Sequence, residues 1–200
     1  SPSEQVLNSL PFYYQQLFLR EHNYYQEFWY GRSKALNEAK TSVRRYKSGY
    51  QGGMLITGEH NSGKTFFSRY IASTMIDDAY TYHIKPVISG SVDVRQFKKA
   101  IEQSVGLQGS YDEIFNQLPI NSVMLIDDAE LWWQKSENGC CVIKKIMELI
   151  EKYSHECLFI INMNKHSFKI INRIVKIENY FLNIIDCNPF DAEELKEIII

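Results

Sequence analysis

The residues best suited to chemistry form one continuous run, Gly58-Glu59-His60-Asn61-Ser62-Gly63-Lys64-Thr65. This run matches the pattern G-x-x-x-x-G-K-[ST] at every fixed position. Glycines allow backbone N–H groups to turn toward phosphate oxygens, a lysine ammonium pairs with the β- and γ-phosphates, and a threonine hydroxyl ligates Mg²⁺. An apolar run precedes the segment, and a helical pattern that opens with Phe66 follows it. The sequence therefore predicts a phosphate-binding loop for Mg-ATP that extends to Phe66, with Lys64 at its surface.

A second set of candidates follows another apolar run, Val123-Met124-Leu125-Ile126, which leads into Asp127-Asp128-Ala129-Glu130. A buried strand that ends in carboxylates is typical of magnesium-dependent nucleotide sites. Asp127 is expected to hold Mg²⁺, directly or through water, and Asp128 to activate the attacking water as general base. Glu130 is a rival for the base role. Capping of a following helix by Asp128 is the structural alternative, and it is compatible with catalysis.

Two further candidates depend on the strands that come next. The run 158–161 leads into Asn162-Met163-Asn164, where a polar side chain can reach the γ-phosphate or the attacking water. Asn162 is the first choice and Asn164 the second, and turn formation is the alternative for either. Arg173 precedes the last apolar run, where an arginine can enter the site of a neighbouring subunit. An ordinary surface arginine is equally consistent with its position.

The elements that must position these residues follow from the hydrophobic pattern. Apolar runs of strand length occur at 53–57, 81–87, 122–127, 157–163 and 181–186, and helical patterns at 33–48, 63–76, 93–105, 138–153 and 166–175. Continuous apolar strands that alternate with helices are typical of a parallel sheet covered on both faces. The sequence therefore predicts an α/β fold, a three-layer α-β-α sandwich with a parallel five-stranded sheet.

Composition restricts the partners. The 200 residues carry a formal net charge of −2, so there is no strong nucleic-acid signal, and the cations of 33–48 are expected on a solvated helix face rather than in an anion-binding patch. The cysteines, Cys140, Cys141, Cys157 and Cys187, lack zinc-site spacing and indicate reduced thiols in a cytoplasmic protein. No apolar run is long enough to span a bilayer.

Together these residues resemble the AAA+ and STAND branches of the P-loop ATPases, and in particular their origin-recognition-like subgroup, over 26–200. The resemblance is carried by 28–32, 58–65, 125–130, Asn162 and 189–195. It implies the strand order 5-1-4-3-2 and places Gly31 and Arg32 on the adenine side. It also implies that Asp128 stands where many relatives have glutamate. The sequence departs from the family in having no arginine-finger motif around Arg173.

The expected organisation has three parts. Residues 1–32 form an aromatic-rich segment leading to the adenine side, 33–190 form the P-loop ATPase core, and 191–200 begin a helical lid. Asp191 and Glu194 fit a capping box at the start of that lid. Because the chain ends within a helical pattern, we expect further domains beyond Ile200.

Two classes of function fit these residues. The first is a Mg²⁺-dependent ATPase that couples ATP binding and hydrolysis to conformational change, acting as a homo-oligomer if Arg173 is a finger. The second is a nucleotide switch that does not turn over, in which ATP or ADP sets the conformation of domains beyond residue 200. A small-molecule kinase is less favoured, because paired aspartates suit the activation of water.

Overall fold

The computed structural model describes residues 32–86 and 91–187. Within the described chain, residues 34–187 belong to one compact unit. The aromatic-rich segment with Gly31 and the proposed lid at 191–200 lie outside the described residues. Arg32 is the first described residue and directly precedes the first described helix.

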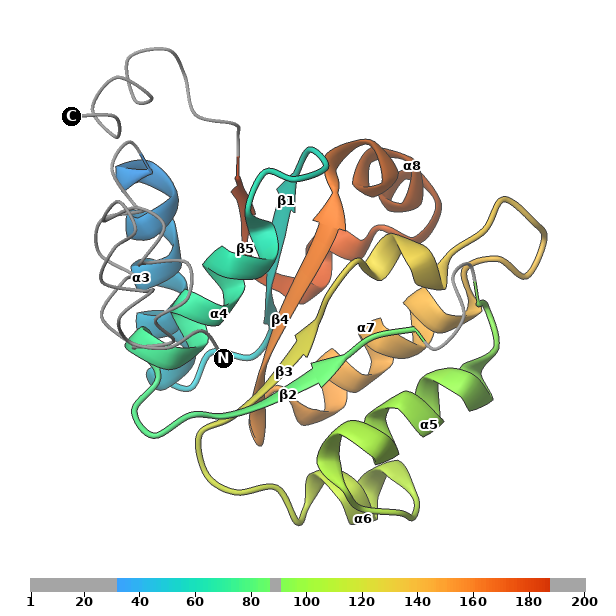
Figure 1. Cartoon of the computed structure of the whole chain (residues 1–200), viewed down its shortest axis with the longest axis horizontal. Helices are drawn as coiled ribbons and strands as arrows, with labels where there is room; N and C mark the ends of the chain where they lie inside the picture. Colours follow the sequence, from blue (N-terminus) through green and yellow to red (C-terminus); the bar gives the residue numbers. More distant parts are fainter. Residues whose placement is uncertain (1–31, 87–90, 188–200) are drawn as a thin grey trace, which may run out of the picture. The chain divides into compact units, whose positions relative to one another are not determined.

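A five-stranded sheet forms the centre of this unit (Figure 1). Its strands are β1 (Gly53–Gly58), β2 (Tyr80–Ile84), β3 (Ser122–Ile126), β4 (Cys157–Asn164) and β5 (Phe181–Asp186). Their order is β2-β3-β4-β1-β5, and every neighbouring pair is parallel. The predicted parallel sheet and the strand order 5-1-4-3-2 are therefore confirmed.

The burial of each strand explains how clearly the sequence pattern predicted that strand. Every residue of β1 and β3 is buried, which requires apolar side chains on both faces. In contrast, β2 lies at one edge of the sheet, where Tyr80 is exposed and only Ile84 is buried. The predicted strand 81–87 is consequently corrected to Tyr80–Ile84, because an edge strand needs no continuous apolar run.

Helices cover both faces of the sheet. They are α3 (Ser33–Lys47), α4 (Lys64–Met75), α5 (Val94–Val105), α6 (Tyr111–Phe115), α7 (Cys141–Tyr153) and α8 (Lys165–Val175), with short 3₁₀ helices η3 (Ala129–Trp132) and η4 (Ile177–Tyr180). Figure 1 shows α3 and α4 on one face and α5, α7 and α8 on the other. This is the predicted three-layer arrangement.

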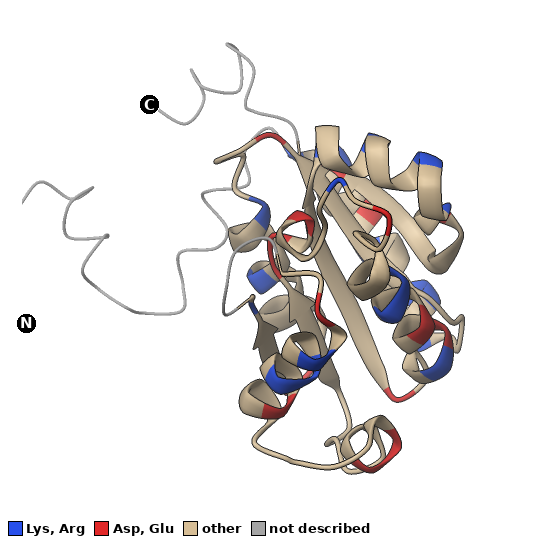
Figure 2. Cartoon of the chain, turned by 90° about the vertical axis from the view of Figure 1, so that its right-hand side faces the viewer, with Lys and Arg blue, Asp and Glu red and all other residues tan. Residues whose placement is uncertain are grey.

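Charged residues of both signs are mixed along the ribbon in Figure 2, where Lys and Arg are interspersed with Asp and Glu on the helices. This distribution agrees with the small net charge of the chain. None of the helices in the described ranges is long and apolar enough to cross a membrane.

Candidate nucleotide-binding site

The predicted site residues gather where the carboxyl ends of β1, β3 and β4 meet. These strands are parallel neighbours, and the register pairs Gly58 with Asn164 and Ile126 with Ile161. The segments that leave β1 and β3 therefore emerge at the same edge of the sheet, on either side of the end of β4. In open parallel sheets, ligands bind outside this edge.

The loop between β1 and α4 depends on glycine at two positions. Gly63 has φ 81°, in the left-handed region that favours glycine, and it is followed by the first residue of α4. At Gly58, an added Cβ atom would lie 2.5 Å from both the Cys187 carbonyl oxygen and the Ser62 hydroxyl oxygen. The Cys187 thiol also donates to the Ser62 carbonyl at 3.3 Å. The residue that follows β5 therefore supports the loop, a contact that sequence reasoning missed.

Lys64 lies inside the loop and not on its surface, which corrects the expectation from sequence. Its side chain is buried, with 7% of its surface exposed. The ammonium donates to the carbonyl oxygens of Gly58 at 3.2 Å and Glu59 at 2.7 Å. The loop wraps around the lysine because these carbonyls point inward, so the charge is held at the centre of the ring of backbone groups.

The side chains around Lys64 differ in exposure. Ser62 is buried, whereas Glu59, His60 and Asn61 are exposed. Phe66 is 38% exposed on the first turn of α4. The loop thus presents its backbone and a polar rim, with one aromatic ring beside it.

The two predicted magnesium ligands meet directly. The Thr65 hydroxyl lies 2.9 Å from both carboxylate oxygens of Asp127, whose side chain is buried. A hydroxyl and a carboxylate are hard oxygen donors of the type Mg²⁺ prefers. Within the described residues there is no cluster of three His, Cys, Asp or Glu side chains.

Asn162 lies next to Asp127, and both the nitrogen and the oxygen of its side-chain amide form hydrogen bonds. Its Nδ2 donates to Asp127 Oδ1 at 2.8 Å, and its Oδ1 accepts from the Ser68 hydroxyl. Ser68 was not anticipated. It stands four positions after Lys64 in a helix, on the same face, so the helical spacing is the signal that would have identified it.

Asp128 and Glu130 differ in environment. Asp128 is exposed, its φ is 48°, and its side chain makes no capping hydrogen bond to η3, so the capping alternative is not observed. Glu130 is half-buried, and its Oε2 accepts from the Asn164 backbone N–H at 3.1 Å. Burial raises the pKa of the Glu130 carboxyl above its ordinary value, although backbone N–H donors and the charge of Lys64 oppose the shift.

The remaining candidates lie outside this group. The Asn164 side chain caps α8 by accepting from the backbone N–H groups of His166 at 2.8 Å and Ser167 at 3.4 Å. Asn164 therefore has a helix-capping role, which differs from the turn-forming alternative expected from sequence. Arg173 is exposed in the last turn of α8, roughly 12 Å along the helix from its first residue.

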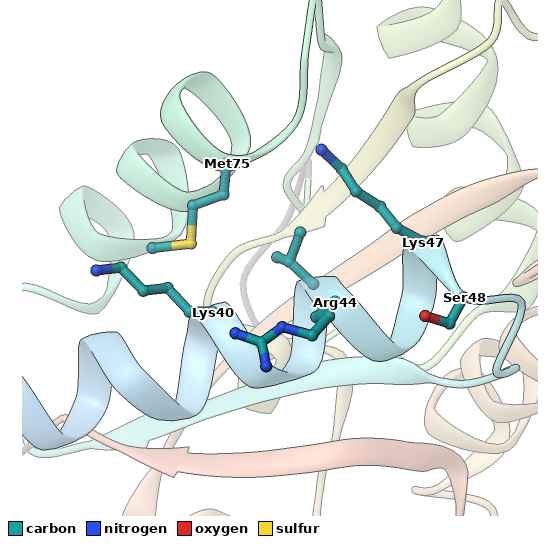
Figure 3. Close-up of a pocket in the computed structure, with 6 residues that line it drawn as sticks. Lys40, Arg44, Lys47, Ser48 and Met75 are labelled. Atoms are coloured by element: carbon teal, nitrogen blue, oxygen red, sulfur yellow. The ribbon is translucent and has the colours of Figure 1, made fainter.

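A separate cleft of about 320 Å³ lies between α3 and the last turn of α4 (Figure 3), lined by Lys40, Val43, Arg44, Lys47, Ser48 and Met75. Lys47 forms an exposed ion pair with Asp77 at 2.8 Å, and Lys40 and Arg44 are also exposed. Because Met75 ends α4, the cleft lies roughly 16 Å along that helix from Lys64. It is not part of the nucleotide site.

Comparison with known proteins supports the fold. No protein-family model and no curated protein matches the sequence. Among solved structures, the chain is similar to the RuvB Holliday junction branch migration motor of Thermotoga maritima, with a TM-score of 0.54 and 16% sequence identity. The match covers 87% of this chain and 51% of that one, so the chain spans about half the length of the motor. The described core thus shares its α/β fold, with the parallel sheet order β2-β3-β4-β1-β5, with that structure.

Proposed function

We propose that this chain binds Mg-ATP in the site formed by the phosphate loop and the end of β3, and that it hydrolyses ATP to drive conformational change. The observation that carries the proposal is the contact of Thr65 with Asp127 beside the enclosed ammonium of Lys64. This contact joins a hydroxyl and a carboxylate, the two protein ligands expected for Mg²⁺. It lies at the end of the loop whose sequence pattern predicts phosphate binding.

The loop supplies the phosphate contacts. Backbone N–H groups between Gly58 and Lys64 and the positive end of α4 favour bound anions. Lys64 carries a full positive charge at the same place, and its present carbonyl partners are replaceable by phosphate oxygens. Thr65 and Asp127 would hold Mg²⁺, which neutralises charge on the β- and γ-phosphates. Gly31 and Arg32 remain predictions for the adenine side.

Hydrolysis requires a base for the attacking water. Asp128 follows the metal ligand directly and its exposed carboxylate is open to solvent, which supports it as the base. The water oxygen would bond to the γ-phosphorus, the proton would pass to the carboxylate, and ADP would leave. Glu130 is the rival, supported by its raised pKa, because a base that titrates nearer neutral pH transfers protons more effectively.

A nucleotide switch without turnover is the second candidate. It is favoured by the environment of Glu130, whose carboxylate is engaged by the Asn164 backbone N–H. In this case ATP and ADP would set the conformation of domains beyond residue 200. Steady-state phosphate release separates an ATPase from a switch, because a switch binds ATP without sustained release.

The binding proposal is tested by titrating the chain with ATP in the presence of Mg²⁺ and in EDTA. We expect tighter binding with Mg²⁺ in the wild type and a much smaller difference in Asp127→Asn, because an amide is a poorer ligand than a carboxylate. Asp78→Asn is the matched control, since Asp78 is exposed after the end of α4. Equal responses to Mg²⁺ in wild type and Asp127→Asn would reject the metal assignment.

A further inference from the structure

A buried chain of polar side chains stands behind the two magnesium ligands. Ser68 on α4 and Asn162 on β4 are completely buried, and Asp127 at the end of β3 is 3% exposed. Ser68 donates to Asn162 Oδ1, and Asn162 Nδ2 donates to Asp127 Oδ1 at 2.8 Å. The chain thus connects three elements that are distant in sequence and ends on a metal ligand.

The direction of these hydrogen bonds follows from the donors available. An ionised carboxylate only accepts, so the part of the Asn162 amide that faces Asp127 must be Nδ2. The amide oxygen then faces Ser68, and the hydroxyl must give its single proton to that oxygen. The Ser68 oxygen also lies 2.9 Å from the Lys64 carbonyl, but that carbonyl has a helical partner of its own in α4.

We infer that Ser68 is a positioning residue that fixes the amide of Asn162, and that Asn162 in turn orients the metal ligand Asp127. The inference rests on the proposed function, and it changes the role expected for Asn162. Nδ2 has a second N–H beside the one given to Asp127, but the Asn162 side chain is completely buried, so contact with a γ-phosphate or a water would require the amide to become exposed. Its geometry therefore suits the support of a ligand better than direct contact with substrate.

We expect loss of the Ser68 hydroxyl to weaken Mg²⁺ binding and to leave phosphate binding unchanged. Groups that hydrogen-bond to metal ligands orient them, and their loss typically lowers metal affinity by about 10- to 100-fold. Without the Ser68 hydroxyl, Asn162 Oδ1 has no donor and the amide is free to rotate away from Asp127. The phosphate contacts of the loop backbone and Lys64 do not pass through Ser68.

The test is a Mg²⁺ titration of ATP binding with the 200-residue chain, using wild type and Ser68→Ala. We expect the Mg²⁺ concentration at half-saturation to rise about tenfold in Ser68→Ala, with ATP binding in EDTA unchanged. Ser73→Ala is the matched control, since Ser73 is exposed on the same helix. Ser68→Thr retains the hydroxyl and should restore most of the Mg²⁺ response.

A double-substitution cycle tests whether Ser68 acts through Asn162. If it does, Ser68→Ala combined with Asn162→Ala will show the same Mg²⁺ half-saturation as Asn162→Ala alone. Additive losses would overturn the inference. So would a normal Mg²⁺ response in Ser68→Ala with slower phosphate release at saturating Mg²⁺, because that pattern would mean that Asn162 contacts the reacting groups.

Two further measurements keep the outcomes distinct. Thermal unfolding without nucleotide shows whether Ser68→Ala is folded. If Ser68→Ala does not fold, Ser68→Cys is measured in its place, because cysteine has a similar volume and is a weaker hydrogen-bond donor. A wild-type chain with no Mg²⁺-dependent ATP binding would overturn the proposed function and this inference together. Normal wild-type binding with an unchanged Mg²⁺ response in the folded Ser68 variant would overturn the inference alone.

Discussion

The Thr65 hydroxyl lies 2.9 Å from both carboxylate oxygens of Asp127, although the two residues are 62 positions apart in the chain. The contact links the first turn of α4 to the residue that follows β3. Because both groups are oxygen ligands suited to Mg²⁺, the proposed phosphate loop and the proposed metal site would share one boundary. The predictions below test the groups on either side of it.

Lys64→Ala should abolish Mg-ATP binding, because it removes the positive charge at the centre of the loop. ATP should raise the melting temperature of the wild type and leave that of the variant unchanged. The nucleotide-free variant should also be less stable, by about 1–3 kcal/mol, since the buried Gly58 carbonyl and the partly buried Glu59 carbonyl lose their donor. Differential scanning fluorimetry with and without Mg-ATP measures both effects.

Lys40→Ala provides the control for that experiment, because Lys40 is an exposed lysine on α3. It should respond to ATP like the wild type. An equal ATP-induced shift in Lys64→Ala and Lys40→Ala would reject the assignment of the phosphate loop.

Asp128→Asn should retain ATP and stop hydrolysis, because an amide cannot take the proton of the attacking water. Phosphate release is measured alongside ATP binding, so that loss of turnover is separated from loss of affinity. Glu130→Gln is compared under the same conditions. Normal turnover in Asp128→Asn with loss of turnover in Glu130→Gln would transfer the base role to Glu130.

The raised pKa of Glu130 predicts a pH-dependent effect on stability. A carboxyl whose pKa is higher in the folded state destabilises the folded protein increasingly as pH rises from the unfolded value of 4.5 through the folded pKa. Glu130→Gln removes this penalty and still offers an acceptor to the Asn164 N–H. Its stability relative to wild type should therefore increase with pH across this window, in urea unfolding measured at several pH values.

Glu137→Gln is the control for the pH series, because Glu137 is exposed. Its stability relative to wild type should stay nearly constant with pH. A flat difference for Glu130→Gln as well would show that the Glu130 carboxyl carries no folding-linked shift.

If Arg173, which is exposed in the last turn of α8, acts as a finger on a neighbouring subunit, catalysis requires that neighbour. Specific ATPase activity should then rise with protein concentration, and Arg173→Ala should lose roughly 10³–10⁵-fold in turnover with little change in ATP affinity. Mixing Arg173→Ala with Asp128→Asn should restore some activity, because each supplies what the other lacks. Lys169→Ala, an exposed change on the same helix, should have no such effect.

Turnover that is independent of concentration and unchanged in Arg173→Ala would reject the arginine finger. It would leave a monomeric ATPase as the interpretation of the site.

The local parts of this protein were determined by the sequence alone. The run Gly58–Thr65 is continuous, so its fixed spacing and its strand–loop–helix setting were visible without a fold. The central strands were equally clear, because burial on both faces requires unbroken apolar runs, as in β1 and β3. The short helix α6 was missed although Ser110 and Glu113 form a capping box that the sequence displays.

The tertiary structure decided how groups from distant segments meet. The support of Gly58 by Cys187 and the link from Ser68 through Asn162 to Asp127 require that strands distant in sequence be neighbours in the sheet. A sequence pattern reports the burial and periodicity of one segment at a time. It carries no information about which hydrogen-bond donor faces which acceptor across two elements, because that depends on register and packing, which are settled only when the sheet assembles.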